Sequence, residues 1–153
     1  QPWSSYAPHF SMRQLSHAIK QSGRTYFFLG DQLGGRPESD TYYDDRGHAL
    51  YNLISTDQGF LEGLDKVLEI AKIRSTAIMC SEEDPAACHR QLLIGRVLQT
   101  MGQDILHIRK DSSVQSYAEV LEANTPEGVQ LGFESIFGES NGEKEWKSVR
   151  PIR

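Results

Sequence analysis

Apolar side chains recur at spacings of three and four residues in three stretches of the chain, and this period is typical of amphipathic helices. We expect a first helix between Ser11 and Gly23, a second that begins near Asp57, and a third that starts at Pro85 and ends at Gly102. The apolar positions that define them are Met12, Leu15, Ala18 and Ile19, then Phe60, Leu64, Val67, Leu68 and Ala71, then Leu93, Ile94, Val97, Leu98 and Met101.

Short runs of β-branched, aromatic and aliphatic residues alternate with these helices, over residues 25–29, 76–80 and 104–108. Such runs are typical of strands that are buried on both faces. Strand–helix–strand alternation predicts an α/β fold, a Rossmann-like three-layer unit with a mostly parallel sheet. Further along the chain the pattern weakens. It predicts a short helix over residues 114–121 and leaves open a strand or an irregular segment over 126–137.

The length of the chain predicts one α/β domain over residues 1–138, followed by a loose, charged tail over 139–153. The first residues contain no initiator Met and no approach strand, so we expect a domain that is incomplete at its N-terminus. Its first sheet edge would then be exposed or covered by another chain, and an oligomer is compatible with this picture. Residues 30–50 form a long glycine-containing loop, which either closes over a ligand or packs as its own small core.

A formal net charge of −5 argues against binding nucleic acid through bulk charge, although a local basic patch stays compatible with it. The two cysteines do not make a disulfide framework, so a cytoplasmic protein is the simplest expectation. No run of 18 apolar residues is present, and we expect no membrane span. Neither a dinucleotide-binding nor a P-loop glycine motif occurs, so we expect no cofactor.

Most of the candidate chemistry lies between Cys80 and Arg90, at the point where a predicted strand leads into the third predicted helix. Ligands of α/β folds bind at such strand ends. If the helix starts at its Asp-Pro sequence, Cys88, His89 and Arg90 fall in its first turns, where free N–H groups attract anions. Two interpretations of Arg90 remain open: it binds a phosphate or carboxylate, or it pairs with a nearby glutamate. Glu82 is equally open, as a proton-transferring or ribose-binding carboxylate or as a partner of that arginine.

Cys88 has three open interpretations. A helix N-terminus and the neighbouring cations would lower its pKa and make it a nucleophile or a redox-sensitive thiol, whereas burial would make it a small apolar residue. Cys80 ends the strand and contributes to the pocket or to the core. We expect no metal, because there is no Cys-x2-Cys pair and adjacent helical residues such as Cys88 and His89 point about 100° apart. His107 alternates with apolar neighbours, which favours a hydrogen-bonded core histidine.

A second candidate element is the loop Gly34-Gly35-Arg36, whose glycines would let the backbone approach a ligand closely. Over roughly residues 5–112 the chain resembles the domain-of-unknown-function 488 family. The resemblance lies in the Cys-Ser-Glu-Glu-Asp-Pro and Cys-His-Arg sequences, in this loop and in the strand around His107. The family's opening strand–helix–strand, which ends in Asp-Val-Arg, is not present, and Ser81 replaces the commoner alanine. The resemblance implies the same α/β fold and the same site, but no particular reaction.

These observations favour an enzyme that acts on a small phosphate-bearing or nucleotide-like ligand. Arg90 and Arg36 would hold the anion together with Gly34, Gly35 and Cys80, and the catalytic candidates are Cys88, His89 and Glu82. The alternative is a non-catalytic module that binds a nucleotide or a partner protein in the same pocket. A thiol redox sensor is a third interpretation.

Overall fold

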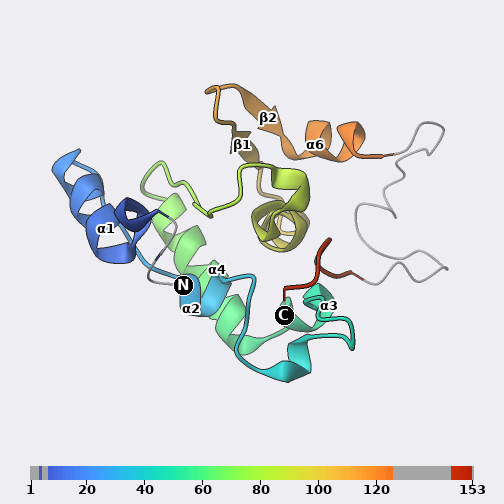
Figure 1. Cartoon of the computed structure of the whole chain (residues 1–153). Coiled ribbons are helices and arrows are strands. Elements are labelled where there is room, and N and C mark those ends of the chain that lie inside the picture. The colour runs from blue at the N-terminus through green and yellow to red at the C-terminus, as the bar shows by residue number, and fades with distance from the viewer. Residues whose placement is uncertain (1–3, 5–6, 126–145, 153) are drawn as a thin grey trace.

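The computed structural model describes residue 4, residues 7–125 and residues 146–152 of the chain. Its helices are α1 (Met12–Gln21), α2 (Gly30–Leu33), α3 (Tyr51–Ile54), α4 (Gln58–Ala71), α5 (Arg96–Thr100) and α6 (Tyr117–Ala123). Short 3-10 turns are η1 (Pro8–Phe10), η2 (Asp40–Tyr42) and η3 (Pro85–Ala87), a π-helical segment is η4 (Arg90–Gly95), and the strands are β1 (Leu106–Ile108) and β2 (Val114–Ser116). Figure 1 shows α3, α4 and α5 grouped together, with β1, β2 and α6 on one side of them.

The hydrophobic core lies among α3, α4, η4 and α5. Helix α4 begins where predicted, because the side chain of Asp57 accepts a hydrogen bond from the main-chain N–H of Phe60. Phe60, Leu64 and Val67 of its apolar stripe are buried and pack with apolar side chains of the other elements, whereas Leu68 is partly buried and Ala71 is exposed. The buried core residues are Leu33, Ala49, Tyr51, Ile54, Phe60, Leu64, Val67, Leu93, Ile94 and Leu98.

The predicted mostly parallel sheet is wrong. Among the described residues the sheet consists of β1 and β2, which pair antiparallel with Leu106 opposite Ser116 and Ile108 opposite Val114. Residues 24–29 and 75–80 are extended but join no strand ladder, and Phe27 and Met79 are 56% and 55% exposed. An apolar, β-branched run becomes a buried strand only when a partner strand and a covering layer are present. In the described part of the chain, β1 and β2 pair across a short turn, and the other pairing consists of two isolated bridges, Tyr43–Ala49 and Leu50–Lys147.

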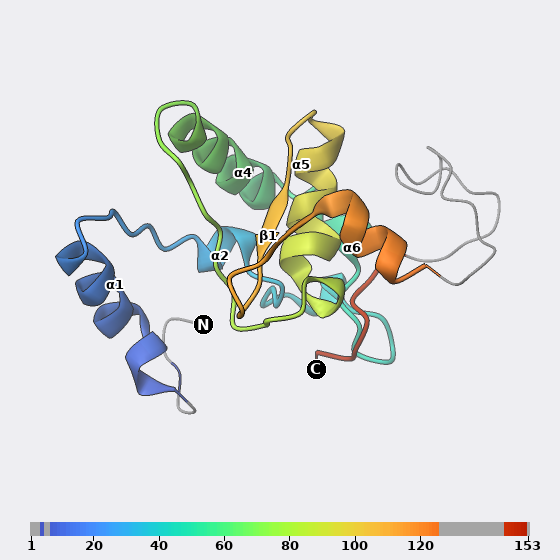
Figure 2. The ribbon, with the colours of Figure 1, turned by 90° about the horizontal axis from the view of Figure 1, so that it is seen from above.

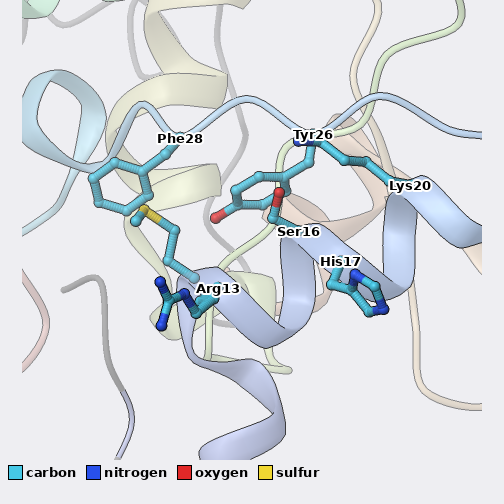
Figure 3. Close-up of a pocket in the computed structure, with 7 residues that line it drawn as sticks. Arg13, Ser16, His17, Lys20, Tyr26 and Phe28 are labelled. Atoms are coloured by element: carbon cyan, nitrogen blue, oxygen red, sulfur yellow. The ribbon is translucent and has the colours of Figure 1, made fainter.

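The first predicted helix forms as α1, but none of its residues is buried. Figures 1 and 2 both show α1 to one side of the molecule, connected to α2 by an extended segment. An open groove lies between α1 and this segment, where Arg13, Lys20, Tyr26 and Phe28 are among the lining residues (Figure 3). None of the site residues predicted from the sequence lines this groove.

The third predicted helix is interrupted. Pro85 opens only the short turn η3, which Asp84 caps, and Cys88 then adopts extended backbone angles of φ −110° and ψ 138°. The chain becomes helical again from His89 and continues through η4 and α5. Gly95 fits the wider π-helical turn, because a Cβ atom at this position would lie 2.9 Å from the carbonyl oxygen of Arg90.

Residues 146–152 pack against the core, in place of the loose tail expected for this stretch. Trp146 accepts main-chain hydrogen bonds from residues 51 and 52, and its indole N–H donates to the carbonyl of Leu92. Arg96 stacks over the indole ring at 4.4 Å, and Ser148 is buried. The remaining part of the expected tail, 139–145, and the possible strand over 126–137 lie outside the described residues.

Candidate functional site

Two cysteines and one histidine meet at the junction between the extended segment 75–80 and the start of η4. The Nδ1 atom of His89 lies 3.6 Å from Sγ of Cys80 and 3.9 Å from Sγ of Cys88. The three atoms all lie within 4.8 Å of one another. Cys88 is fully buried, whereas Cys80 and His89 are partly exposed, so one side of the cluster is accessible. We call these three residues the Cys-Cys-His cluster.

The interruption of the helix at Cys88 creates this convergence. The sequence argument that Cys88 and His89 point in different directions assumed that both lie on a regular helix. Because Cys88 is extended and His89 is the first helical residue, both side chains are directed toward Cys80 instead. The geometric objection to a shared ion is therefore wrong for this backbone.

The predicted glycine loop lies against the cluster. A Cβ atom on Gly35 would be 2.7 Å from Cγ and 2.9 Å from Cβ of His89, so the backbone touches the imidazole where no side chain fits. Gly34 follows α2 and donates its N–H to the carbonyl of Gly30, and a Cβ on Gly34 would overlap this same carbonyl oxygen. Both glycines are thus required by close packing, and the structure brings the glycine loop together with a cluster that is distant from it in the sequence.

Arg90 fastens the loop between the two cysteines. Its Nη2 donates to the main-chain carbonyl of Glu82 at 2.6 Å, and its Nε and main-chain N–H both approach Sγ of Cys88 at 3.4 Å. Among the described residues Arg90 forms no ion pair with a carboxylate. The side chain of Glu82 is exposed, so neither of its two predicted roles is fixed by a contact.

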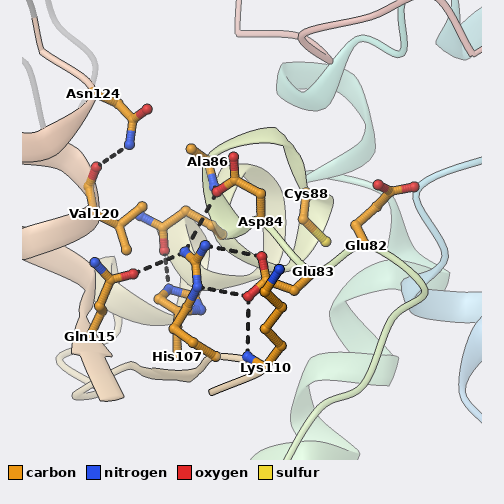
Figure 4. A network of polar contacts seen from close by, with 12 residues as sticks. Glu82, Glu83, Asp84, Ala86, Cys88, His107, Lys110, Gln115, Val120 and Asn124 are labelled. Carbon is orange, nitrogen blue, oxygen red and sulfur yellow. Dashed lines mark hydrogen bonds and ion pairs between the residues drawn. The ribbon is translucent and has the colours of Figure 1, made fainter. Parts of the chain in front are cut away.

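The neighbouring carboxylate, Glu83, binds Arg109 instead, through two hydrogen bonds of 2.9 and 3.0 Å, and accepts a third from the main chain of Lys110 (Figure 4). The N–H of Lys110, together with Arg109, holds the pKa of Glu83 below its usual range. This contact joins the loop to the end of β1. Sequence reasoning missed Arg109, because nothing in the local pattern marks a partner 26 residues away.

The two neighbouring thiols shift each other's pKa in opposite directions, so that Cys80 is the one that ionises more readily. The Cys88 thiol beside Cys80, reinforced by His89, lowers the pKa of Cys80 to about 3, although burial acts in the opposite direction. A thiolate at Cys80 and burial together raise the pKa of Cys88 above its ordinary value, even though Arg90 favours the charged form. The structure therefore reverses the expectation that Cys88 carries the lowered pKa.

Two further residues singled out in the sequence lie outside the Cys-Cys-His cluster. Arg36 follows Gly35 and is exposed. Burial raises the pKa of the Tyr43 hydroxyl, and the charge of Arg36 lowers it, against this larger effect. His107 is buried on β1, and its Nε2 lies 2.5 Å from Oε1 of Gln91 in the π-helical segment. The hypothesis of a hydrogen-bonded core histidine is thus confirmed.

These features define a small, helix-rich protein in which a Cys-Cys-His cluster is held by an arginine and backed by a glycine loop. The family model described as "Domain of unknown function DUF488" matches residues 1–97, which include all three cluster residues, and the chain belongs to this family. No curated protein and no solved structure is significantly similar to the chain. Within the described part of the chain, each helix is too short or too polar to cross a membrane.

Proposed function

We propose that the protein is an enzyme that acts on a small anionic ligand, phosphate-bearing or nucleotide-like, at the Cys-Cys-His cluster. The observation that carries this proposal is the convergence of Cys80, Cys88 and His89 within 4.8 Å beside Arg90. A soft nucleophile, an imidazole and a guanidinium in one place are the groups that covalent or acid–base catalysis on an anion requires.

The charge around Arg90 supports an anionic ligand. Because its Nη2 binds a neutral carbonyl and no described carboxylate pairs with it, its positive charge is not neutralised by a salt bridge. The nearby acidic side chain of Glu83 is already engaged by Arg109. A phosphate is a suitable partner for a fixed guanidinium. Arg36, one residue beyond the glycine that touches His89, is the second cation available to such a ligand.

The accessible members of the cluster are the candidates for chemistry. Cys80 and His89 are partly exposed, whereas Cys88 is fully buried, so we assign the nucleophile to Cys80 and a supporting role to Cys88. His89 and the exposed carboxylate of Glu82 are the candidates for proton transfer.

The test combines binding and turnover. Binding of inorganic phosphate and AMP is measured by calorimetry for wild type, Arg90→Gln and Arg24→Gln, an exposed arginine next to α1 that serves as the control. Phosphate release from nucleotides and sugar phosphates is measured in parallel, with Glu82→Gln and Cys80→Ser. We expect binding to weaken only in Arg90→Gln, and turnover to fall in Glu82→Gln and Cys80→Ser while binding persists. Binding without turnover of any of these compounds would favour the non-catalytic module, and equal binding by all variants would contradict the site.

A further inference from the structure

The two S···N distances of the Cys-Cys-His cluster are close to those between the ligands of a tetrahedral metal ion, and the two sulfurs lie within 4.8 Å of each other. With Zn–S and Zn–N bonds of ~2.3 and ~2.0 Å, tetrahedral angles separate S from N by roughly 3.5 Å and the two sulfurs by roughly 3.8 Å. The observed S···N distances are 3.6 and 3.9 Å, and every pair is within 4.8 Å. We infer that Cys80, Cys88 and His89 form a zinc site of the Cys2His type, with a fourth coordination position left open.

Two segments of the chain hold these ligands in place. Cys80 ends the extended segment 75–80, whereas Cys88 stands at the break before the π-helical segment and His89 is the N-cap residue of that segment. The loop that joins Cys80 to Cys88 is fastened at one point by Arg90 and at another by Arg109. Ligands held before an ion arrives lose less conformational freedom when it binds.

The surroundings of the cluster provide the contacts that orient metal ligands. Two N–H groups of Arg90 point at Sγ of Cys88, as hydrogen-bond donors to a metal-bound thiolate would. The backbone of Gly35 packs closely against the imidazole of His89 and limits its movement. In the part of the chain that the structure describes, no other group of three such side chains converges in this way.

The donor set favours zinc. Two thiolates and one imidazole suit a borderline-soft ion, whereas Mg²⁺ and Ca²⁺ prefer oxygen ligands. Structural zinc sites have four protein ligands, and sites that bind a substrate or water keep one position open. The partial exposure of Cys80 and His89 places the open position on the accessible side. This inference deepens the proposed function and assigns the residues more closely: with zinc bound, Cys80 and His89 are metal ligands, the anion takes the open position beside Arg90, and proton transfer falls to Glu82. The zinc site itself does not depend on an anion.

The experiment uses the full chain, purified under reducing conditions, loaded with Zn²⁺ and dialysed. Bound zinc is measured by mass spectrometry, and the affinity is measured by competition with a chromophoric chelator. We expect one zinc per chain in wild type and in His17→Gln, a control histidine on α1. Cys80→Ser and His89→Gln should weaken binding by more than about 100-fold, since even outer-shell changes cost 10–100-fold. Circular dichroism verifies that each variant is folded.

Cobalt provides a second, spectroscopic measurement that reports the ligands of the ion directly. Co²⁺-loaded wild type should show the visible absorption of a tetrahedral ion and a sulfur-to-cobalt charge-transfer band, and Cys80→Ser should lose about half of that band. Phosphate binding is measured with and without zinc, so that the two proposals fail separately: zinc without phosphate binding overturns only the anion proposal. Phosphate binding by a protein that takes up no zinc, or an unchanged zinc affinity in folded Cys80→Ser and His89→Gln, would overturn the zinc site.

Discussion

Replacing Gly35 by alanine tests whether the glycine loop positions the Cys-Cys-His cluster. The added Cβ would lie 2.7 Å from Cγ, 2.9 Å from Cβ and 3.0 Å from Nδ1 of His89. Unstrained carbon–carbon contacts are ~3.5–4.0 Å, so the imidazole or the loop must move by roughly 1 Å. Neither group is the free end of a flexible side chain, and the movement is therefore costly. The expected loss of stability from overpacking is about 1–3 kcal/mol.

The same displacement exceeds what the proposed zinc site tolerates. Metal–ligand distances hold within roughly 0.2 Å, and a ring shifted by about five times that amount cannot keep Nδ1 in place without further rearrangement. We expect Gly35→Ala to weaken zinc binding by about 10–100-fold, the range observed when groups that orient a ligand are changed. The melting temperature should fall by roughly 3–9 °C.

The assay measures zinc affinity by chelator competition and stability by thermal unfolding of the zinc-free protein. Gly23→Ala is the matched control, because Gly23 has φ +76° and no atom lies within 4 Å of the position that its new Cβ would occupy. This variant should lose about 1–2 kcal/mol through backbone strain alone and bind zinc normally. A Gly35→Ala protein that binds zinc as tightly as wild type would refute the reasoning, and an equal loss in both variants would show that the effect comes from general destabilisation.

Three further predictions concern the fold, and all are measured by urea unfolding. Phe60→Ala should cost about 3–5 kcal/mol of stability, because Phe60 lies in the core and is 1% exposed. Phe27→Ala should change stability by less than about 0.5 kcal/mol, because Phe27 is 56% exposed. A large effect at Phe27 would contradict the finding that its segment is unpaired. The Lys147 ammonium lowers the pKa of Asp44 from its ordinary value of 3.8, so the ion pair stabilises the fold above about pH 4 and this stabilisation is lost as the pH falls further. Asp44→Asn should therefore be less stable than wild type at pH 7, and its stability should fall less steeply in acid. An unchanged dependence of stability on acidic pH would argue against the pair. Trp146→Phe removes the indole N–H that donates to a carbonyl of the π-helical segment and should cost about 1–3 kcal/mol of stability. An unchanged stability would contradict the packing of residues 146–152 against the core.

Local sequence signals determined where α1 and α4 lie and where α5 ends. The cap at Asp57, the apolar stripe that follows it and the glycine at residue 102 specify α4 and the end of α5, because helix periodicity and capping act over a few residues. They also located the candidate site, since Cys80, Cys88, His89 and Gly35 were all named from motifs and the structure brings them together.

Tertiary structure decided the sheet and the geometry of the site. The runs over 25–29 and 76–80 carry strand-forming residues, but strand pairing is a non-local interaction, and a run without a partner remains an exposed extended segment. Likewise, no local rule shows that the chain straightens at Cys88 between η3 and η4. That single extended residue directs two neighbouring side chains to one point. The sequence alone named Cys80, Cys88, His89 and Gly35 as candidates for a site. The packing of distant segments decided that their atoms meet, because side-chain direction depends on backbone angles that tertiary contacts select.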